Sequence, residues 1–174
     1  MKFKAQIMDE AAVRRSLARM THEIIEKNRG VGEICLLGIQ RRGLPLARML
    51  AENMRRFEGV EVPVGQIDIT RFRDDRDCPA QPECHAEDSL PRHHVILVDD
   101  VIYTGRTARA AIEAVFSRGR PQSIQLAVLI DRGHRELPIR PDFVGKNIPT
   151  ARSELVSVLV PDIDGETGVR LYDL

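Results

Sequence analysis

Two adjacent carboxylates, Asp99 and Asp100, follow a short apolar run and precede a turn rich in hydroxyl groups. The run, Val95–Val98, has the length and composition of a strand buried on both faces, and ligands of open α/β sheets bind at the carboxyl ends of such strands. Backbone N–H groups at the start of the following helix, in residues 104–107, can surround a phosphate. The carboxylates can accept hydrogen bonds from a ribose diol and stabilise a nearby cation or a developing oxocarbenium charge. The segment therefore predicts a ribose phosphate ligand.

Residues 95–107 resemble the phosphoribosyl-diphosphate signature of the type I phosphoribosyltransferases, in which apolar residues lead to two acids and a Thr-Gly-rich phosphate loop. The resemblance implies that Asp99 and Asp100 are the catalytic residues and stabilise the sugar cation. An ordinary strand-to-helix turn with an acidic cap is the alternative interpretation. The motifs of P-loop NTPases and of dinucleotide-binding enzymes are absent from the sequence. The resemblance implies a loop that binds the phosphate of phosphoribosyl diphosphate (PRPP), formed by Val101, Tyr103, Thr104, Gly105, Arg106 and Thr107.

A second polar turn, Gln40–Gly43, follows the apolar run Ile34–Ile39 and reaches the same sheet edge if the strands are parallel. In the type I family the corresponding loop binds diphosphate largely through backbone amides, often with a strained peptide near its start. By that resemblance, Arg41, Arg42 and Gly43 bind diphosphate, although Arg41 stands where the family has a small hydroxyl residue. Without the acidic site, the two arginines could equally be surface residues of a turn.

The polar stretch Arg71–Arg92 contains three of the ten prolines of the chain and almost no periodicity, which predicts a long loop. In the type I family a mobile loop of this kind closes over the substrate and excludes water, so that hydrolysis does not compete. The resemblance implies that Arg73 reaches the diphosphate on closure. The family usually has an aliphatic residue and a tyrosine where this chain has Arg71 and Phe72, and the rest of the loop is shortened, so the lid departs from the family pattern.

Residues 123–150 resemble the base-binding and carboxyl-terminal region of the bacterial pyrimidine operon attenuators, and differ from ordinary uracil-salvage enzymes. The resemblance implies a base-binding site formed by Arg132, His134, Lys146 and Ile148, in which the stretch around 146–148 covers the base and reads its polar edge through backbone groups. A uracil ring needs donors and acceptors beside an apolar wall, and this stretch can supply both. Without the family match, Arg132 and His134 could be surface loop residues. No general base is assigned, although His134 is possible.

The implied reaction is attack of uracil N1 on C1′ of PRPP, which releases diphosphate and forms UMP. Mg²⁺ would neutralise the leaving group and would be held with the substrate near Asp99 and Asp100, without a dedicated set of protein ligands.

A mostly basic stripe follows one side of the helix that is predicted to begin after the N-cap Asp9 and to end near Asn28. Its members recur in steps of four and three: Arg15, Arg19, His22, Glu26 and Arg29. In the attenuator family this helix helps to bind a stem-loop in the leader mRNA of pyrimidine genes, more tightly when UMP is bound. A solvated helix face is the alternative, and Ala18 falls where a hydroxyl could have contacted phosphate. The matching RNA-binding positions are Arg19, His22, Lys27, Arg135, Arg140, Lys146 and Arg152.

Apolar runs alternate with helical patterns, which predicts a parallel α/β sheet and, with the resemblance, a type I phosphoribosyltransferase fold in one domain spanning residues 1–174. The predicted strands Phe143–Gly145 and Glu154–Val160 have no long helix between them, so we expect antiparallel pieces or a small hood there. The other predicted elements are strands Ile34–Ile39, Val62–Ile69, His94–Val98 and Ser123–Ile130, and helices from Leu44 to about Arg56 and over Arg106–Arg118.

The chain has 174 residues, of which 43% are hydrophobic and 30% charged, as expected for one domain with its own core. Its longest apolar stretches are strand-sized, so we expect neither a membrane span nor a secretory signal, and a soluble cytoplasmic protein. Basic and acidic residues number 26 each, so no global field indicates a nucleic-acid partner. Three cysteines (Cys35, Cys78 and Cys84) form a poor disulfide framework, and their spacing to His85 does not match a common zinc knuckle.

Two other functions stay open. One is a plain nucleobase phosphoribosyltransferase without RNA binding, and the other is a regulator that binds nucleotides but has lost useful catalysis. The intact acidic pair and threonines of residues 99–107 argue against the second. Since type I folds usually pair through faces beside the site, we expect a homodimer or a multiple of one.

Overall fold

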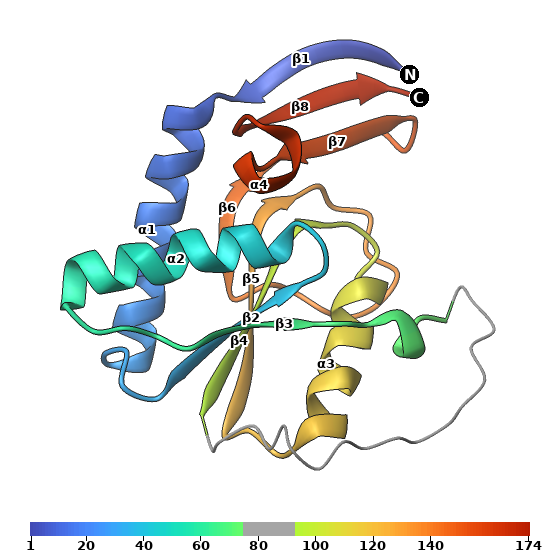
Figure 1. Ribbon diagram of the computed structural model, residues 1–174. Helices are drawn as coiled ribbons and strands as arrows, with labels where there is room; N and C mark the ends of the chain where they lie inside the picture. The colour runs from blue at the N-terminus through green and yellow to red at the C-terminus, as the bar shows by residue number, and fades with distance from the viewer. Residues whose placement is uncertain (75–92) are drawn as a thin grey trace.

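The computed structural model describes residues 1–74 and 93–174 (Figure 1). Most of the predicted loop Arg71–Arg92, with Cys78, Cys84 and His85, lies outside the described residues. None of the described helices is long and apolar enough to span a membrane. In chain order the elements are β1 (Lys2–Met8), α1 (Glu10–Asn28), β2 (Ile34–Ile39), α2 (Gly43–Glu58), β3 (Val64–Ile67), the 3-10 helix η1 (Thr70–Phe72), β4 (His94–Ile102), α3 (Arg106–Arg118), β5 (Ser123–Asp131), β6 (Phe143–Asn147), β7 (Glu154–Leu159), α4 (Pro161–Asp164) and β8 (Gly168–Asp173).

Five strands form a parallel sheet in the order β3-β2-β4-β5-β6. All six residues of β2 are buried, as are Val95–Val98 in β4, because helices cover both faces of the sheet. The predicted α/β class is confirmed. Since the strands are parallel, the turns that follow β2, β4 and β5 lie at the same edge of the sheet.

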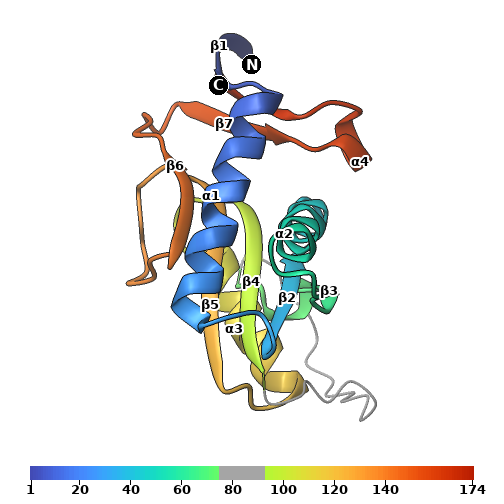
Figure 2. The same cartoon turned by 90° about the vertical axis from the view of Figure 1, so that its left-hand side faces the viewer.

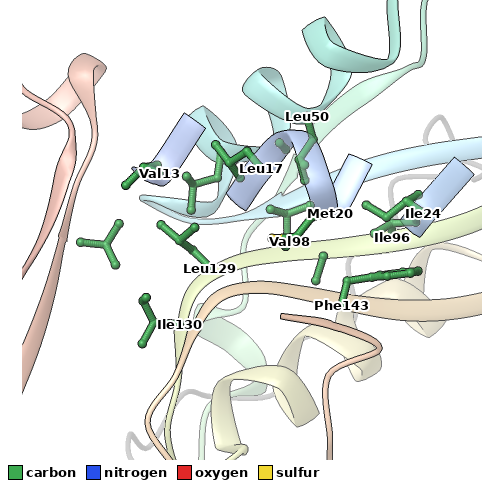
Figure 3. Packing of buried hydrophobic residues seen from close by; sticks show 14 of the residues in the cluster. Val13, Leu17, Met20, Ile24, Leu50, Ile96, Val98, Leu129, Ile130 and Phe143 are labelled. Atoms are coloured by element: carbon green, nitrogen blue, oxygen red, sulfur yellow. The ribbon is translucent and has the colours of Figure 1, made fainter. Parts of the chain in front are cut away.

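Helices α1 and α2 lie on one face of the sheet and α3 lies on the other (Figure 1 and Figure 2). Buried side chains recur every three to four residues along α1, at Val13, Leu17, Met20 and Ile24. They pack against side chains of β4, β5 and α2 in one hydrophobic cluster (Figure 3). The inner face of α3 consists mainly of alanines, so this helix can approach the sheet closely.

A smaller antiparallel sheet, in the order β1-β8-β7, lies over the carboxyl edge of the parallel sheet, and we call it the hood (Figure 1). The predicted strand from Glu154 belongs to the hood, as expected. The strand predicted at Phe143–Gly145 is confirmed as β6. The expectation that it forms an antiparallel piece or part of a hood was wrong, because β6 pairs in parallel with β5 and extends the main sheet. Strand β1 was not predicted, and it joins the two ends of the chain through the pair Lys2 and Asp173.

Two strand boundaries differ from the prediction in ways that affect the edge of the sheet. Strand β4 continues to Ile102, so Asp99 and Asp100 lie within the strand. Strand β3 is shorter than predicted and is followed by η1. Helix α1 begins as predicted, with the Asp9 side chain accepting a hydrogen bond of 2.7 Å from the backbone N–H of Ala12.

Candidate functional site

The acidic pair lies near the end of the central strand β4, where Asp99 is beside Val128 of β5. The backbone N–H of Asp100 donates to Oδ1 of Asp99 at 2.9 Å, and the N–H of Val101 donates to Oδ1 of Asp100 at 2.8 Å. Burial raises the pKa of Asp99 well above its ordinary range, and the neighbouring Asp100 charge adds to this effect. Burial also raises the pKa of Asp100, although the N–H of Val101 and the charge of Arg42 act in the opposite direction. A positive charge placed near these two carboxyl groups would therefore favour their ionised forms.

The phosphate loop predicted after β4 lies at the N-terminus of α3, where the orphan N–H groups and the helix dipole favour an anion. Gly105 precedes the helix with φ of 93°, a conformation that other residues rarely adopt. The Oγ1 of Thr104 accepts a hydrogen bond of 3.3 Å from the N–H of Arg106. A cavity of about 130 Å³ opens here, lined by Asp99, Val101, Ile102, Tyr103, Thr104, Gly105, Thr107, Ala108, Leu126 and Val128.

The cavity brings Asp99 together with five of the six residues that sequence reasoning assigned to phosphate binding. The exception is Arg106, whose side chain is occupied elsewhere. Its Nε donates to Glu136 at 2.8 Å, and its Nη1 forms an ion pair with Asp74. Arg106 thus connects the predicted phosphate loop to the first residues of the predicted lid.

The turn after β2 lies against β4 because two glycines allow a very close approach. A Cβ on Gly43 would lie 2.2 Å from the carbonyl oxygen of Val98, and one on Gly38 would lie 2.3 Å from Cα of Leu44. The peptide bond between Gln40 and Arg41 is cis. The loop predicted to bind diphosphate therefore lies directly beside the strand that carries the acidic pair.

The two arginines of this turn, Arg41 and Arg42, differ in their contacts. Arg42 donates to the carbonyl of Val158 at 2.7 Å and to Asp164 at 2.8 Å, so it ties the turn to the hood and α4. Arg41 is exposed and has no ion pair in the part of the chain that the structure describes. Diphosphate binding at this turn would therefore depend mainly on backbone groups.

Arg73, the arginine predicted to reach diphosphate, is exposed and directly follows η1. Arg109 of α3 holds this segment by donating to the carbonyl of Phe72 at 2.6 Å. The rest of the predicted lid lies outside the described residues, so closure stays a prediction.

Arg132, predicted to lie at the base, is buried, with a relative exposure of 6%. Its guanidinium stacks over the ring of Tyr103, with 4.3 Å between Cζ and the ring centroid. It donates to Oγ1 of Thr150 at 3.0 Å and to the carbonyls of Ala151 and Glu154 at 3.0 and 2.7 Å. Arg132 therefore joins the end of β5 to the start of the hood, and it forms a wall together with Tyr103.

His134 lies against the same wall, with its ring 5.7 Å from that of Tyr103. Its Nε2 is 2.5 Å from the carbonyl oxygen of Thr150, and because a carbonyl only accepts, Nε2 carries the proton in this contact. The sequence did not single out Thr150, since a threonine after a proline carries no signal of its own. Its role becomes visible only when residues 132 and 150 are placed side by side.

Lys146 and Asn147 are the last residues of β6, and Ile148 follows the strand at the same edge of the sheet. The N–H of Ile148 donates to the carbonyl of Asp131 at 2.8 Å, and the Ile148 side chain is buried. Lys146 is paired with Ile130 in the sheet and has an exposed side chain. Both predicted base-binding residues of this segment thus lie close to the end of β5.

Six of the seven predicted RNA-binding residues are exposed, and two of them connect α1 to the segment of β6. Arg19 of α1 donates to the carbonyls of Val144 and Gly145 at 3.1 and 2.5 Å, which joins the helix to β6. Lys27 forms an ion pair of 2.6 Å with Asp142, just before β6. The other exposed members of the set are His22, Arg140, Lys146 and Arg152.

Arg135 differs from the other predicted RNA-binding residues in its burial and in its internal hydrogen bonds. It is half-buried and donates to the carbonyls of Tyr103 and Ile139, both at 2.9 Å, and to Asp131 at 2.5 Å. These contacts fix the segment after β5 against the phosphate loop. Several donors of Arg135 are therefore used inside the protein, and its contact with RNA stays a prediction.

Comparison with known proteins agrees with this arrangement. The family described as "Phosphoribosyl transferase domain" matches residues 5–160. Proteins named "Bifunctional protein PyrR" are 56% identical in Clostridium novyi (99% of each chain), 55% in Clostridium acetobutylicum (100% of each chain) and 54% in Acetivibrio thermocellus (98% of this chain, 95% of that one).

Solved structures share the fold at lower identity. The hypoxanthine phosphoribosyltransferase of Trypanosoma cruzi superposes with a TM-score of 0.75 at 21% identity, covering 98% of this chain and 97% of that one. The same enzyme in complex with the product IMP also gives a TM-score of 0.75, at 22% identity. By the family match and by its identity to relatives over almost the whole of both chains, the protein belongs to the phosphoribosyltransferase family and, within it, to the bifunctional PyrR proteins.

Proposed function

We propose that this protein transfers the 5-phosphoribosyl group of PRPP to uracil, forming UMP and diphosphate, and also attenuates the transcription of pyrimidine genes by binding a leader mRNA stem-loop when UMP is bound. The observation that carries the enzymatic half is the cavity at the end of β4. It combines a desolvated carboxylate, Asp99, with the helix N-terminus and hydroxyls of residues 104–107. One end of this site suits a phosphate and the other suits a sugar that becomes cationic.

In the proposed reaction, the backbone of residues 104–107 and the hydroxyls of Thr104 and Thr107 bind the 5-phosphate. Asp99 and Asp100 accept hydrogen bonds from the ribose diol and stabilise the positive charge that develops on the ring as diphosphate leaves. The turn at Arg41, Arg42 and Gly43 receives the diphosphate, chiefly through backbone N–H groups. No covalent nucleophile is needed, because uracil N1 attacks C1′ directly.

The acidic pair fits a bound Mg²⁺. Burial raises the pKa of Asp99 and Asp100, so a cation nearby would favour the ionised forms of both. In the described part of the chain, no group of three or more His, Cys, Asp or Glu side chains could hold a metal by itself. We therefore propose that Mg²⁺ binds with PRPP near Asp99 and Asp100, without direct protein ligands, and neutralises the leaving diphosphate.

For the base, we propose a pocket between the Tyr103–Arg132 wall and residues 146–148. The His134 side chain donates from Nε2 to Thr150, so its Nδ1 is the atom that can accept a hydrogen bond from a uracil N–H. Backbone groups near Lys146 and Ile148 would read the other polar atoms of the ring. A fixed set of donors and acceptors of this kind can select a pyrimidine over a purine.

The enzymatic proposal is tested by incubating the protein with PRPP, Mg²⁺ and uracil, hypoxanthine or guanine, and by measuring nucleotide formation. We expect turnover of uracil at least about 100-fold above that of either purine, because a site built for one hydrogen-bonding pattern leaves buried polar groups unpaired with another. Comparable turnover of all three bases would indicate a general nucleobase phosphoribosyltransferase.

For the regulatory half, we propose that RNA binds across α1 and β6 through Arg19, His22, Lys27, Arg140, Lys146 and Arg152. Arg19 supports a link between the two ligands, because it bonds to carbonyls of β6 and that strand leads directly to Ile148 at the proposed base pocket. A nucleotide that orders residues 146–148 would then also order the RNA-binding side chains. Such coupling must be reciprocal, so RNA would tighten UMP binding by the same factor.

The RNA proposal is tested by measuring the affinity of a pyrimidine leader stem-loop with and without UMP, for the wild type, for Arg19→Gln and for His22→Ala. We expect UMP to tighten binding by wild-type protein, and each variant to weaken it about 10-fold. Uracil turnover of both variants should stay within about twofold of the wild type. A wild-type protein that turns over uracil but does not bind the RNA would be a plain enzyme.

We also propose that the chain forms a single domain, works in the cytoplasm and assembles as a homodimer or a multiple of one. Sedimentation equilibrium at several concentrations tests the assembly, and a monomer at micromolar concentration would contradict it.

A further inference from the structure

A groove of about 520 Å³ lies between α1, α2 and α4, separate from the cavity at the end of β4. Figure 1 shows α1 and α2 side by side, with α4 next to the hood. The floor is apolar and includes Leu17, Pro45 and Met49. Its volume is in the range of sites that bind a nucleotide-sized ligand.

Arginines dominate the polar rim of the groove. Four arginines line it, Arg14, Arg15, Arg48 and Arg56, against two acidic residues. Arg14 is paired with Glu10 and Arg48 with Asp162, whereas Arg15 and Arg56 have no ion pair among the described residues. The rim therefore carries positive charge that an anionic partner would neutralise.

An aromatic pair closes one end of the groove. The rings of His22 and Phe57 are stacked, with centroids 4.3 Å apart and planes 10° apart. Phe57 lines the groove, and 38% of its surface is exposed. Aromatic side chains and arginine planes beside an apolar floor are the groups on which unpaired RNA bases stack.

We propose that this groove binds unpaired nucleotides from the loop of the regulatory RNA, with bases against Phe57 and the floor and phosphates against Arg15 and Arg56. The proposal rests on the proposed RNA-binding function and extends that surface from α1 onto α2. The positive charge of the groove complements RNA. The groove also lies next to His22, which belongs to the proposed RNA-binding surface. Base-paired stem would contact α1 and β6, while the loop would enter the groove.

The test uses two RNA probes, a pyrimidine leader stem-loop and the same stem closed by a stable tetraloop, with UMP present. The variants are Phe57→Ala, the double variant Arg15→Gln/Arg56→Gln, and the control Arg120→Gln, an exposed arginine after α3 on the other face of the sheet. We expect each groove variant to bind the stem-loop about 10-fold more weakly and the tetraloop probe nearly as the wild type does. In the double variant, the loss of two phosphate contacts should also reduce the slope of log affinity against log salt concentration by about 1.4.

Uracil turnover and melting temperature show that the variants are folded, and Arg120→Gln should match the wild type throughout. Equal binding of the stem-loop by groove variants and wild type would overturn the inference while leaving the proposed RNA function intact. Failure of the wild type to bind either RNA would overturn both. If the groove variants instead change the oligomeric state in light scattering without changing RNA affinity, the groove is a protein interface and the inference is wrong.

Discussion

Gly43, in the turn after β2, lies so close to Val98 that a Cβ on the glycine would be 2.2 Å from the valine carbonyl oxygen. Val98 immediately precedes Asp99, so this contact fixes the distance between the turn proposed to bind diphosphate and the acidic pair. Only the absence of a side chain at residue 43 allows it.

Replacement of Gly43 by alanine should therefore displace the turn from β4. We expect the free energy of unfolding to fall by about 3 kcal/mol and the melting temperature by about 10 °C. The kcat for UMP formation should be at least about 100-fold lower. The matched control is Gly32→Ala, because no atom lies within 4 Å of a Cβ at that position. A Gly43→Ala variant with normal stability and activity would show that the close approach is not required.

The burial of Asp99 has a consequence for stability as a function of pH. Because its pKa is raised in the folded protein, ionisation costs stability, and this cost is present at neutral pH and disappears below about pH 3.8, where both folded and unfolded states are protonated. Asp99→Asn keeps the shape without the charge. It should raise the melting temperature by about 5 °C at pH 7, with a smaller gain at pH 5.

Asp164→Asn provides the opposite control, since it removes the ion pair with Arg42 and should lower the melting temperature at pH 7. Differential scanning fluorimetry over pH 4–8 measures both variants. If Asp99→Asn destabilised the protein at pH 7, the carboxylate would have to be stabilised in the folded state, contrary to the geometry of the site.

Arg132 holds two parts of the proposed base pocket in place, because its guanidinium packs on the ring of Tyr103 and donates to Thr150. Arg132→Lys would keep the charge but lose the planar contact and most of the hydrogen bonds. We expect the KM for uracil to rise at least about 10-fold, while the KM for PRPP changes less than about threefold. Steady-state kinetics measure both, with Arg120→Lys as the control. An equal rise in both constants would assign Arg132 a general structural role.

The structure also separates Arg135 from the exposed basic residues around it. Arg135→Gln loses bonds to Tyr103, Ile139 and Asp131, so it should lower the melting temperature by about 5 °C and raise the KM for PRPP. Arg140→Gln should leave the melting temperature and the KM for PRPP unchanged, and it should weaken RNA binding. The reverse pattern, with Arg135→Gln affecting only RNA, would contradict the observed contacts.

Elements with strong local patterns were predictable from the sequence. Helix α3 was predicted with its observed ends because a glycine stands on each side of it, and β2 is a continuous apolar run. Strand β1 was missed although polar and apolar side chains alternate from Lys2 to Ile7, and most of its residues are exposed. Its partner lies at the other end of the chain, as the pair Lys2 and Asp173 shows, and such a pairing leaves no local signal.

The candidate site was predictable to the extent that its residues are adjacent in the chain. Asp99 and the residues of the phosphate loop form one continuous segment, and the structure places them around one cavity. The functions of Arg42, Arg132 and Arg135 could not be separated from the sequence, because each depends on backbone carbonyls that only the fold brings near. The groove beside Phe57 likewise depends on the packing of α1 against α2.

The most direct test of the central claim is UMP formation from uracil, PRPP and Mg²⁺ by the wild type and by the double variant Asp99→Asn/Asp100→Asn, with Asp173→Asn in the hood as control. We predict turnover by the wild type and the control, and at least about a 1,000-fold lower kcat in the folded double variant, because the charge that stabilises the sugar cation is gone. Full turnover by the double variant would contradict the proposed role of the acidic pair, and no turnover by the wild type with any base would contradict the enzyme itself.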